Sequence, residues 1–201
     1  VGSATTINEM RELAAKTPFD NEIIDFLNTL SKMLMKLPEA KMYPDVITLA
    51  FWMRKSSVME FRKRFMKQTK DIVLGRGIAF HIAPSNVPVN YAYSLVTGLL
   101  TGNANIVRIP SKEFPQVSII NKAIKSILEE YPNVARYICL VRYERDPNIN
   151  DLISGIADIR IIWGGDNTIK EIRKSPLGAR ANDVTFADRY SLAVIDSEQY
   201  L

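Results

Sequence analysis

The chain has 201 residues, and its 26 lysines and arginines outnumber its 22 aspartates and glutamates, for a net charge of +4. Its 47% hydrophobic and 24% charged residues are average for a globular domain and argue against disorder, fibrous repeats and a disulfide-dense scaffold. One cysteine and one histidine exclude an internal disulfide and a Cys/His zinc site, and we expect no metal. The longest apolar runs, such as residues 47–53, are too short to cross a bilayer and no signal segment opens the chain, so we expect a cytoplasmic protein without integral membrane contact.

The positive charge is concentrated in residues 54–70, where Glu60 is the only acid. Apolar residues at 58, 61 and 65 recur at helical spacing, so the bases should lie on the outer face of an amphipathic helix. We expect a solvated helix face and no nucleic-acid partner, because most charge runs face water. The alternative is a non-catalytic binding module, in which this helix docks nucleic acid or an acidic partner. The bases concerned are Arg54, Lys55, Arg62, Lys63, Arg64, Lys67 and Lys70.

The first 70 residues predict a helical amino-terminal region. Residues 1–3 lack an initiating methionine and resemble an expression scar, so we leave them out of the fold prediction. Thr6 and Glu9 have the spacing of a capping box, and residues 17–20 carry a second helix start with proline in the first turn. An apolar stripe over residues 23–34 follows and ends at Pro38.

A further helix is expected over residues 51–66. We expect these helices to pack against the following domain or a partner domain. Because their apolar stripes exceed what one small sheet can cover, they could also form contacts between subunits.

From residue 72 onward, short apolar runs alternate with helical segments, which is typical of βαβ units. The runs show no strict alternation, so the strands should be buried on both faces, as in a parallel sheet. We therefore predict an open, mainly parallel, Rossmann-like α/β sheet in residues 71–201. The expected strands are residues 77–82, 105–109, 137–141, 159–162 and 191–195. The expected helices are residues 89–100, 117–130, 151–155 and 168–174.

The loops after the strands matter most, because parallel α/β sheets bind ligands beyond the carboxyl ends of their strands. Asn86 lies between Pro84 and Pro88, in the loop between the first strand and the next helix. Its carboxamide could donate to an oxyanion that forms from a carbonyl or a thioester. It could instead cap the helix, and the residues alone favour the cap.

The loop after the second strand contains Pro110, Ser111 and Lys112, where the adenosine ribose of a dinucleotide normally lies. A hydroxyl followed by a lysine accepts a 2′-phosphate that an acid would repel, so this pair favours NADP over NAD. Arg108 adds a second cation nearby. A simple polar turn is an equally good interpretation of the same residues.

Gly164 and Gly165 follow a strand and precede a helix, so a pyrophosphate could approach their backbone, although paired glycine turns are common. His81 lies within an apolar strand, and we interpret it as a hydrogen-bonded core residue rather than a catalytic base. Cys139 also lies in an apolar strand, where burial should raise the pKa of its thiol and leave it inert.

Four blocks of the sequence carry a family resemblance. They are residues 51–55, 77–95, 102–112 and 161–166, including the Pro-Ser-Asn-Val-Pro stretch at residues 84–88. In this order they closely resemble the acyl-CoA reductase family, which includes the fatty-acid reductase of the bacterial bioluminescence operon. That family belongs to the aldehyde dehydrogenase superfamily, so the resemblance implies the nucleotide-binding domain of an aldehyde dehydrogenase.

By this resemblance, Asn86 donates to the thioester oxygen, which reverses the preference for a helix cap. Ser111 stands where NAD-preferring relatives hold a ribose-binding glutamate, which suits NADPH. Arg108 occupies the position of a lysine that touches the ribose, and the paired glycines match a turn beside the pyrophosphate and the nicotinamide ribose. The implied cofactor-binding residues are Ala83, Pro84, Ser85, Arg108, Pro110, Ser111, Lys112, Gly164 and Gly165.

Two departures from the superfamily pattern shape the expected function. The Glu-Leu-Gly-Gly-Lys stretch, which supplies a base for hydrolysis, has no counterpart near residues 186–191, as suits transfer of the acyl group to or from CoA. The nucleophilic cysteine should lie downstream of this chain. The resemblance therefore implies NADPH-dependent reduction of a fatty acyl-CoA or acyl-protein thioester to the aldehyde, by an enzyme that is a homo-oligomer at full length. We expect residues 1–201 alone to be inactive, because the catalytic cysteine domain is absent from them.

Overall fold

The structure is a computed structural model, and it describes residues 1–68, 71–144, 146–189 and 192–196. Lys70 of the predicted basic helix and Ser191 of the last predicted strand lie outside the described residues. Within the described residues, no helix is both long enough and apolar enough to span a membrane.

The described residues contain one sheet of five parallel strands in the order β3-β2-β1-β4-β5. Every residue of β1 is buried, as the prediction of strands covered on both faces requires. The chain runs from β1 outward to β3 and then returns to β4 on the other side of β1, so the direction of winding reverses between β1 and β4. The strands are β1 (Ile78–Ile82), β2 (Ala104–Arg108), β3 (Ile138–Val141), β4 (Ile159–Trp163) and β5 (Asn182–Phe186).

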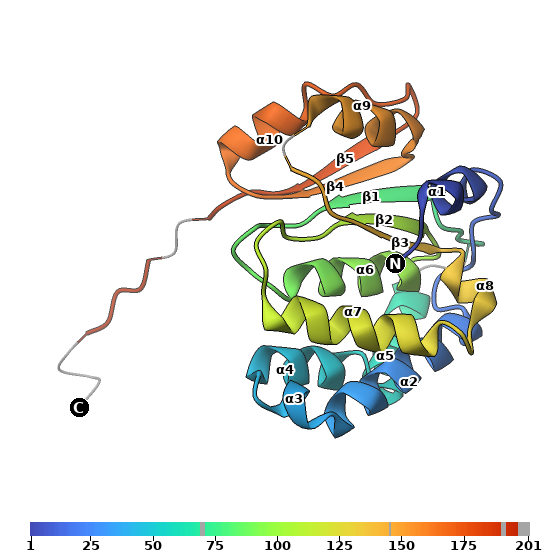
Figure 1. The fold of residues 1–201 in the computed structure, drawn as a ribbon, viewed down its shortest axis with the longest axis vertical. Helices are drawn as coiled ribbons and strands as arrows, with labels where there is room; N and C mark the ends of the chain where they lie inside the picture. The colour runs from blue at the N-terminus through green and yellow to red at the C-terminus, as the bar shows by residue number, and fades with distance from the viewer. Residues whose placement is uncertain (69–70, 145, 190–191, 197–201) are drawn as a thin grey trace.

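Helices cover both faces of the sheet (Figure 1). On one face lie α6 (Asn90–Leu100) and α7 (Pro115–Ile127), followed by the short α8 (Pro132–Ala135), and on the other lie α9 (Pro147–Ile156) and α10 (Asp166–Ile172). This arrangement confirms the predicted open parallel α/β sheet.

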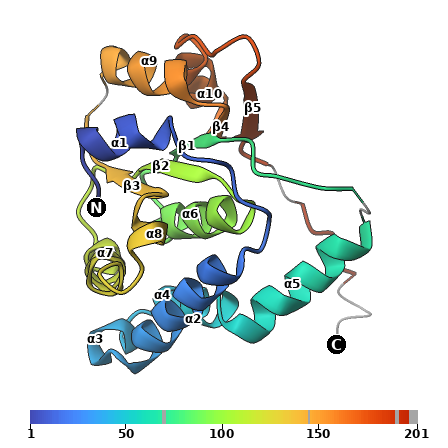
Figure 2. The same cartoon turned by 90° about the vertical axis from the view of Figure 1, so that its right-hand side faces the viewer.

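The amino-terminal helices form a further layer beneath α6 and α7 (Figures 1 and 2). The apolar stripe of α2 (Asn21–Lys36) is buried against α4, α6 and α7, so the chain itself covers it and the stripe gives no argument for subunit contacts. The layer is completed by α3 (Pro38–Lys41), α4 (Pro44–Trp52) and α5 (Lys55–Gln68), and α5 extends away from it in Figure 2. By contrast, α1 (Ala4–Met10) lies beside the sheet.

The start of the chain differs from the prediction. Residues 1–3 are part of the fold, because the carbonyl oxygen of Val1 accepts a 2.8 Å hydrogen bond from the backbone of Leu140 on β3. The capping box of α1 is formed by Ser3 and Thr6, one turn before the predicted pair of Thr6 and Glu9. The first helix therefore starts earlier than predicted and ends at Met10.

The other boundary errors also have local causes. Asp20 caps α2 by accepting from the backbone of Glu22 at 3.1 Å, and Phe19 has a left-handed φ of 57°, so the proline-first start at residues 17–20 is wrong. The helix predicted over residues 51–66 is two helices, because α4 ends at Trp52 and α5 begins at Lys55. The last strand is Asn182–Phe186, while residues 192–195 form no strand.

Candidate functional site

The predicted loops meet at the carboxyl edge of the sheet in a wide cleft of about 1260 Å³. The cleft lies where the winding of the sheet reverses, which is the usual ligand position in open α/β sheets. A backbone hydrogen bond of 3.4 Å from Ala83 to Arg108 joins the first two loops. The predicted site residues that line the cleft are Ala83, Pro84, Ser85, Asn86, Arg108, Pro110, Ser111, Gly164 and Gly165.

Asn86 is exposed in the loop between β1 and α6. The helix begins at Asn90, and its N-cap is Val89, with no capping hydrogen bond from a side chain. The helix-cap interpretation of Asn86 is therefore wrong, and its carboxamide remains available to the cleft that it lines. Asn90 lines the same cleft, and its buried Oδ1 atom has no hydrogen-bond partner among the described residues.

Arg108 and Ser111 converge on the carbonyl oxygen of Tyr143. The Nη2 atom of Arg108 donates to this oxygen at 3.3 Å, the Ser111 hydroxyl donates at 3.5 Å, and the guanidinium lies 4.5 Å from the Tyr143 ring centroid. Burial raises the pKa of Tyr143 to about 12, so its phenol stays neutral, although the Arg108 charge opposes the shift. Lys112 does not line the cleft, and its ammonium group lies 5.3 Å from the Phe114 ring centroid instead.

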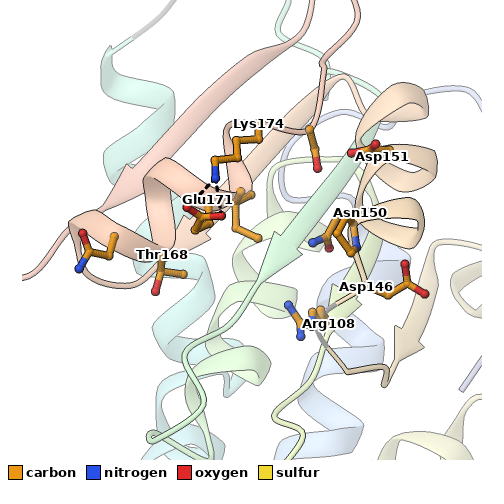
Figure 3. Close-up of a pocket in the computed structure, with 11 residues that line it drawn as sticks. Arg108, Asp146, Asn150, Asp151, Thr168, Glu171 and Lys174 are labelled. Atoms are coloured by element: carbon orange, nitrogen blue, oxygen red, sulfur yellow. Dashed lines mark hydrogen bonds and ion pairs between the residues drawn. The ribbon is translucent and has the colours of Figure 1, made fainter.

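A second cavity of about 360 Å³ lies next to the cleft, between α9 and α10. Arg108 and Thr168 line both cavities, so the two spaces are neighbours. Figure 3 shows Arg108 at the base of the second cavity and the Lys174–Glu171 ion pair, 2.8 Å long, at its other side. Sequence reasoning missed this cavity, because most of its lining residues come from α9, α10 and the segments beside these helices rather than from the loops that follow the strands.

Gly164 and Gly165 connect β4 to α10 at the cleft. The backbone of Gly164 donates to the carbonyl oxygen of Phe186 at 3.2 Å, which ties the turn to the end of β5. A Cβ atom at Gly165 would lie 2.5 Å from the Asp188 carboxylate, so this acidic side chain lies directly against the turn. With Asp166 opening the seven-residue α10, two acids flank the turn and disfavour a pyrophosphate directly on it.

The cleft also contains two aromatic residues that the sequence analysis did not assign to the site, Trp163 and Phe186. Their rings stack with centroids 3.9 Å apart and planes 10° apart. Both are the last residues of neighbouring parallel strands, β4 and β5. The sequence analysis placed the last strand at residues 191–195, so it did not expect Phe186 to lie at the end of a strand beside Trp163.

The structure agrees with the interpretation of the two lone titratable residues. His81 is 1% exposed and hydrogen-bonded through both ring nitrogens, so it is a core residue. Burial raises the pKa of the Cys139 thiol, which lies on β3 at the edge of the sheet, covered by residues 2 and 3. Neither residue lines the cleft.

The basic helix α5 is separate from the cleft residues. It buries Val58 alone among its residues, and two of its bases form exposed ion pairs, Lys55 with Asp25 and Arg64 with Glu60. This is the predicted amphipathic helix, with Phe61 and Phe65 packed against the core. Whether its outer face docks an acidic partner stays a prediction.

The fold is that of the aldehyde dehydrogenases. One solved structure with a similar fold is the glyceraldehyde-3-phosphate dehydrogenase GapN of Methanocaldococcus jannaschii complexed with NADP, with a TM-score of 0.62 and 17% identity over 91% of this chain and 44% of that one. Another is the betaine aldehyde dehydrogenase of Staphylococcus aureus in complex with NAD+, with a TM-score of 0.62 and 15% identity over 90% of this chain and 41% of that one. At these identities the likeness defines the fold alone.

The family follows from the sequence match. The model of the acyl-CoA reductase (LuxC) family matches residues 4–201, so the chain belongs to that family. The long-chain acyl-protein thioester reductase 2 of Photobacterium leiognathi is 28% identical over 62% of this chain. The long-chain acyl-protein thioester reductase of Aliivibrio fischeri is 24% identical over 61% of it. The chain spans about a quarter of the length of each, with 26% covered.

Proposed function

We propose that this chain is the nucleotide-binding part of an enzyme that reduces a long-chain acyl thioester to the aldehyde with NADPH. The observation that supports it most is the convergence of the loops around Asn86, Ser111 and Gly164 in one cleft at the point where the sheet reverses its winding. Family membership and the names of the thioester reductases above support the substrate class, which is an acyl group on CoA or on a protein.

The residues present fit an elongated dinucleotide. The cleft of about 1260 Å³ and the neighbouring cavity of about 360 Å³ share Arg108, so a ligand can extend from Asn86 past this guanidinium towards α9 and α10. Arg108 and Ser111 would hold the adenosine ribose and its 2′-phosphate, through a charge-assisted hydrogen bond and a hydroxyl donor. When bound, NADPH would supply the reducing equivalents.

Asn86 would act on the substrate rather than on the nucleotide. Its Nδ2 group would donate to the thioester oxygen as negative charge develops there, and such donors typically contribute about 3 kcal/mol to the transition state. The acyl group would be carried by a cysteine outside residues 1–201, because Cys139 is buried in the sheet. β5 contributes Thr185 and Phe186 to the cleft and contains no glutamate, which suits transfer of the acyl group rather than its hydrolysis.

The test of the cofactor site compares two neighbouring residues. Ser111→Glu places a carboxylate inside the cleft. Lys112→Glu changes the net charge of the chain by more, but residue 112 does not line the cleft. We expect Ser111→Glu to weaken NADPH binding about tenfold or more, with a smaller effect on NADH, because the carboxylate repels the 2′-phosphate. Calorimetric titration of both nucleotides checks this. A larger loss from Lys112→Glu would place the 2′-phosphate elsewhere.

A further inference from the structure

A chain of buried polar groups leads from the aromatic pair in the cleft into the protein interior. The Nε1 atom of Trp163 donates to the Ser94 hydroxyl at 3.2 Å. This hydroxyl lies 2.7 Å from Nδ1 of His81, and Nε2 of His81 lies 2.9 Å from Oδ1 of Asn105. We call Trp163, Ser94, His81 and Asn105 the relay.

Every hydrogen bond in the relay has one possible direction. The Nδ2 group of Asn105 donates to the carbonyl oxygen of Asn103 at 2.7 Å, which leaves Oδ1 to accept from His81. Nε2 of His81 must therefore carry the proton, and Nδ1 must accept. Ser94 then donates to His81 and keeps its lone pairs for the indole, so one arrangement satisfies all four side chains.

The surrounding packing holds the relay in place. His81, Ser94 and Asn105 are all buried, with 5% or less of each residue exposed. A Cβ atom at Gly98 of α6 would lie 2.9 Å from Nε2 of His81, so the backbone of α6 closes directly over the imidazole. Burial lowers the pKa of His81 to about 4, against an opposing contribution from Asn105, which keeps the acceptor at Nδ1 available at neutral pH.

The relay ends on a ring that lines the cleft. Trp163 stacks on Phe186 at 3.9 Å, and both residues line the cleft together with Gly164 and Asn86. An indole rotated about its Cβ–Cγ bond would occupy a similar volume but would carry Nε1 away from Ser94, leaving a buried hydroxyl without its donor. The hydrogen bond to Ser94 therefore selects one orientation of the stacked ring.

We propose that Ser94 and His81 are positioning residues that fix the orientation of Trp163, so that the Trp163–Phe186 pair presents a rigid aromatic surface to the pyridine ring of the bound nucleotide. This inference rests on the proposed function. A planar, partly apolar ring is the chemistry that an aromatic pair at a pocket wall recognises, and offset stacking adds to the area that it buries.

The experiment uses Trp163 as its own reporter. The sequence has two tryptophans, so Trp52→Phe leaves Trp163 as the only indole, and the phenyl ring can retain packing against Phe61 and Tyr93. In this background we compare Ser94→Ala, Ser94→Thr and Ser31→Ala. Ser31 is the matched control, because its buried hydroxyl donates to the carbonyl oxygen of Ala50 at 2.6 Å. Ser31 lies outside the cleft.

We expect Ser94→Ala to shift the emission of Trp163 and lower its anisotropy, and to raise the Kd for NADPH about five- to tenfold. Ser94→Thr restores the hydroxyl and should recover most of both signals. Ser31→Ala should change neither. Equal Kd values and equal emission spectra for Ser94→Ala and Ser31→Ala would overturn the positioning role. If the unsubstituted chain binds no NADPH, the proposed function itself fails, which is a separate result.

Discussion

Cys139 is the only thiol in the chain, and its place on β3 makes it unsuitable as a nucleophile. It is 1% exposed, and burial raises the pKa of its thiol, so little reactive thiolate forms at neutral pH. We therefore predict that residues 1–201 do not oxidise NADPH in the presence of an acyl-CoA, and that Cys139→Ala leaves nucleotide binding unchanged. NADPH oxidation is measured by absorbance at the NADPH band, and nucleotide binding by calorimetry. Thioester-dependent oxidation that persists in Cys139→Ala would contradict the proposed source of the nucleophile.

Single residues of the candidate site were predictable to different degrees. Nine of the predicted residues could be located because they lie at or just after the ends of strands, and parallel strands bring their carboxyl ends to one edge. Lys112 is one position further along, where the chain has turned away from the cleft. Glu144 lines the cleft after β3 and was missed, since no local motif marks it. Its negative charge opposes binding of a 2′-phosphate, so the proposed selectivity for NADPH would require Arg108 and Ser111 to outweigh it.

At the scale of the elements, a buried arginine holds the second half of the sheet together. Arg160 on β4 is 1% exposed and forms two hydrogen bonds to the Asp183 carboxylate on β5, of 2.8 and 3.1 Å. It also donates to the Ser154 hydroxyl on α9 at 3.0 Å and to the carbonyl oxygen of Ser175 at 2.9 Å. One side chain therefore connects β4, β5 and α9, and it supports the strand that carries Phe186.

We predict that Asp183→Ala lowers the free energy of unfolding by about 3 kcal/mol, because it leaves the charge of Arg160 buried without its partner. Asp25→Ala is the matched control. It removes a 2.9 Å ion pair with Lys55 whose side chains are both 55% exposed, and such pairs contribute about 0.5 kcal/mol. Urea denaturation of the two variants measures the difference. Similar losses for both would show that Arg160 does not depend on Asp183.

Strong local signals made most elements predictable. Apolar runs bounded by glycine and proline located the first four strands to within one or two residues. The strands β1 to β3 are buried along almost their whole length and leave a continuous apolar pattern, whereas β4 alternates partly buried and buried residues. The fifth strand, Asn182–Phe186, alternates exposed and partly buried residues at the sheet edge, so its pattern is weak. The apolar residues 192–195 gave the stronger signal and were predicted as a strand wrongly. The break at residues 53–54 has no proline or glycine to mark it.

At the scale of the whole molecule, His81 couples stability to pH. Its pKa in the folded chain is about 4, mainly because of burial, against 6.5 for an ordinary histidine. The unfolded chain therefore binds a proton between these values that the folded chain does not, so stability should fall as pH decreases from 6.5 to 4, by about 3 kcal/mol. The hydrogen-bond partners of the ring are the neutral Ser94 and Asn105.

Thermal unfolding from pH 7 to pH 4 checks this, with His81→Gln as the control. The variant lacks the titrating group, so its stability should decline less steeply between pH 7 and pH 4. This difference in slope is expected even if the variant is less stable than the parent at pH 7. Parallel declines for the two proteins would assign the acid sensitivity to other groups. As His81 is the only histidine, the ring nitrogen signals in an NMR spectrum also report its tautomer directly, and we predict a proton on Nε2.

The central claim is that NADPH binds in the cleft formed by the strand-end loops. Amide hydrogen exchange of the chain with and without saturating NADPH tests it most directly. We predict slower exchange in residues 83–87, 108–111 and 163–168, and no change in α5. Protection confined to α5, or no protection in any of the three loops at a concentration that saturates binding, would contradict the account.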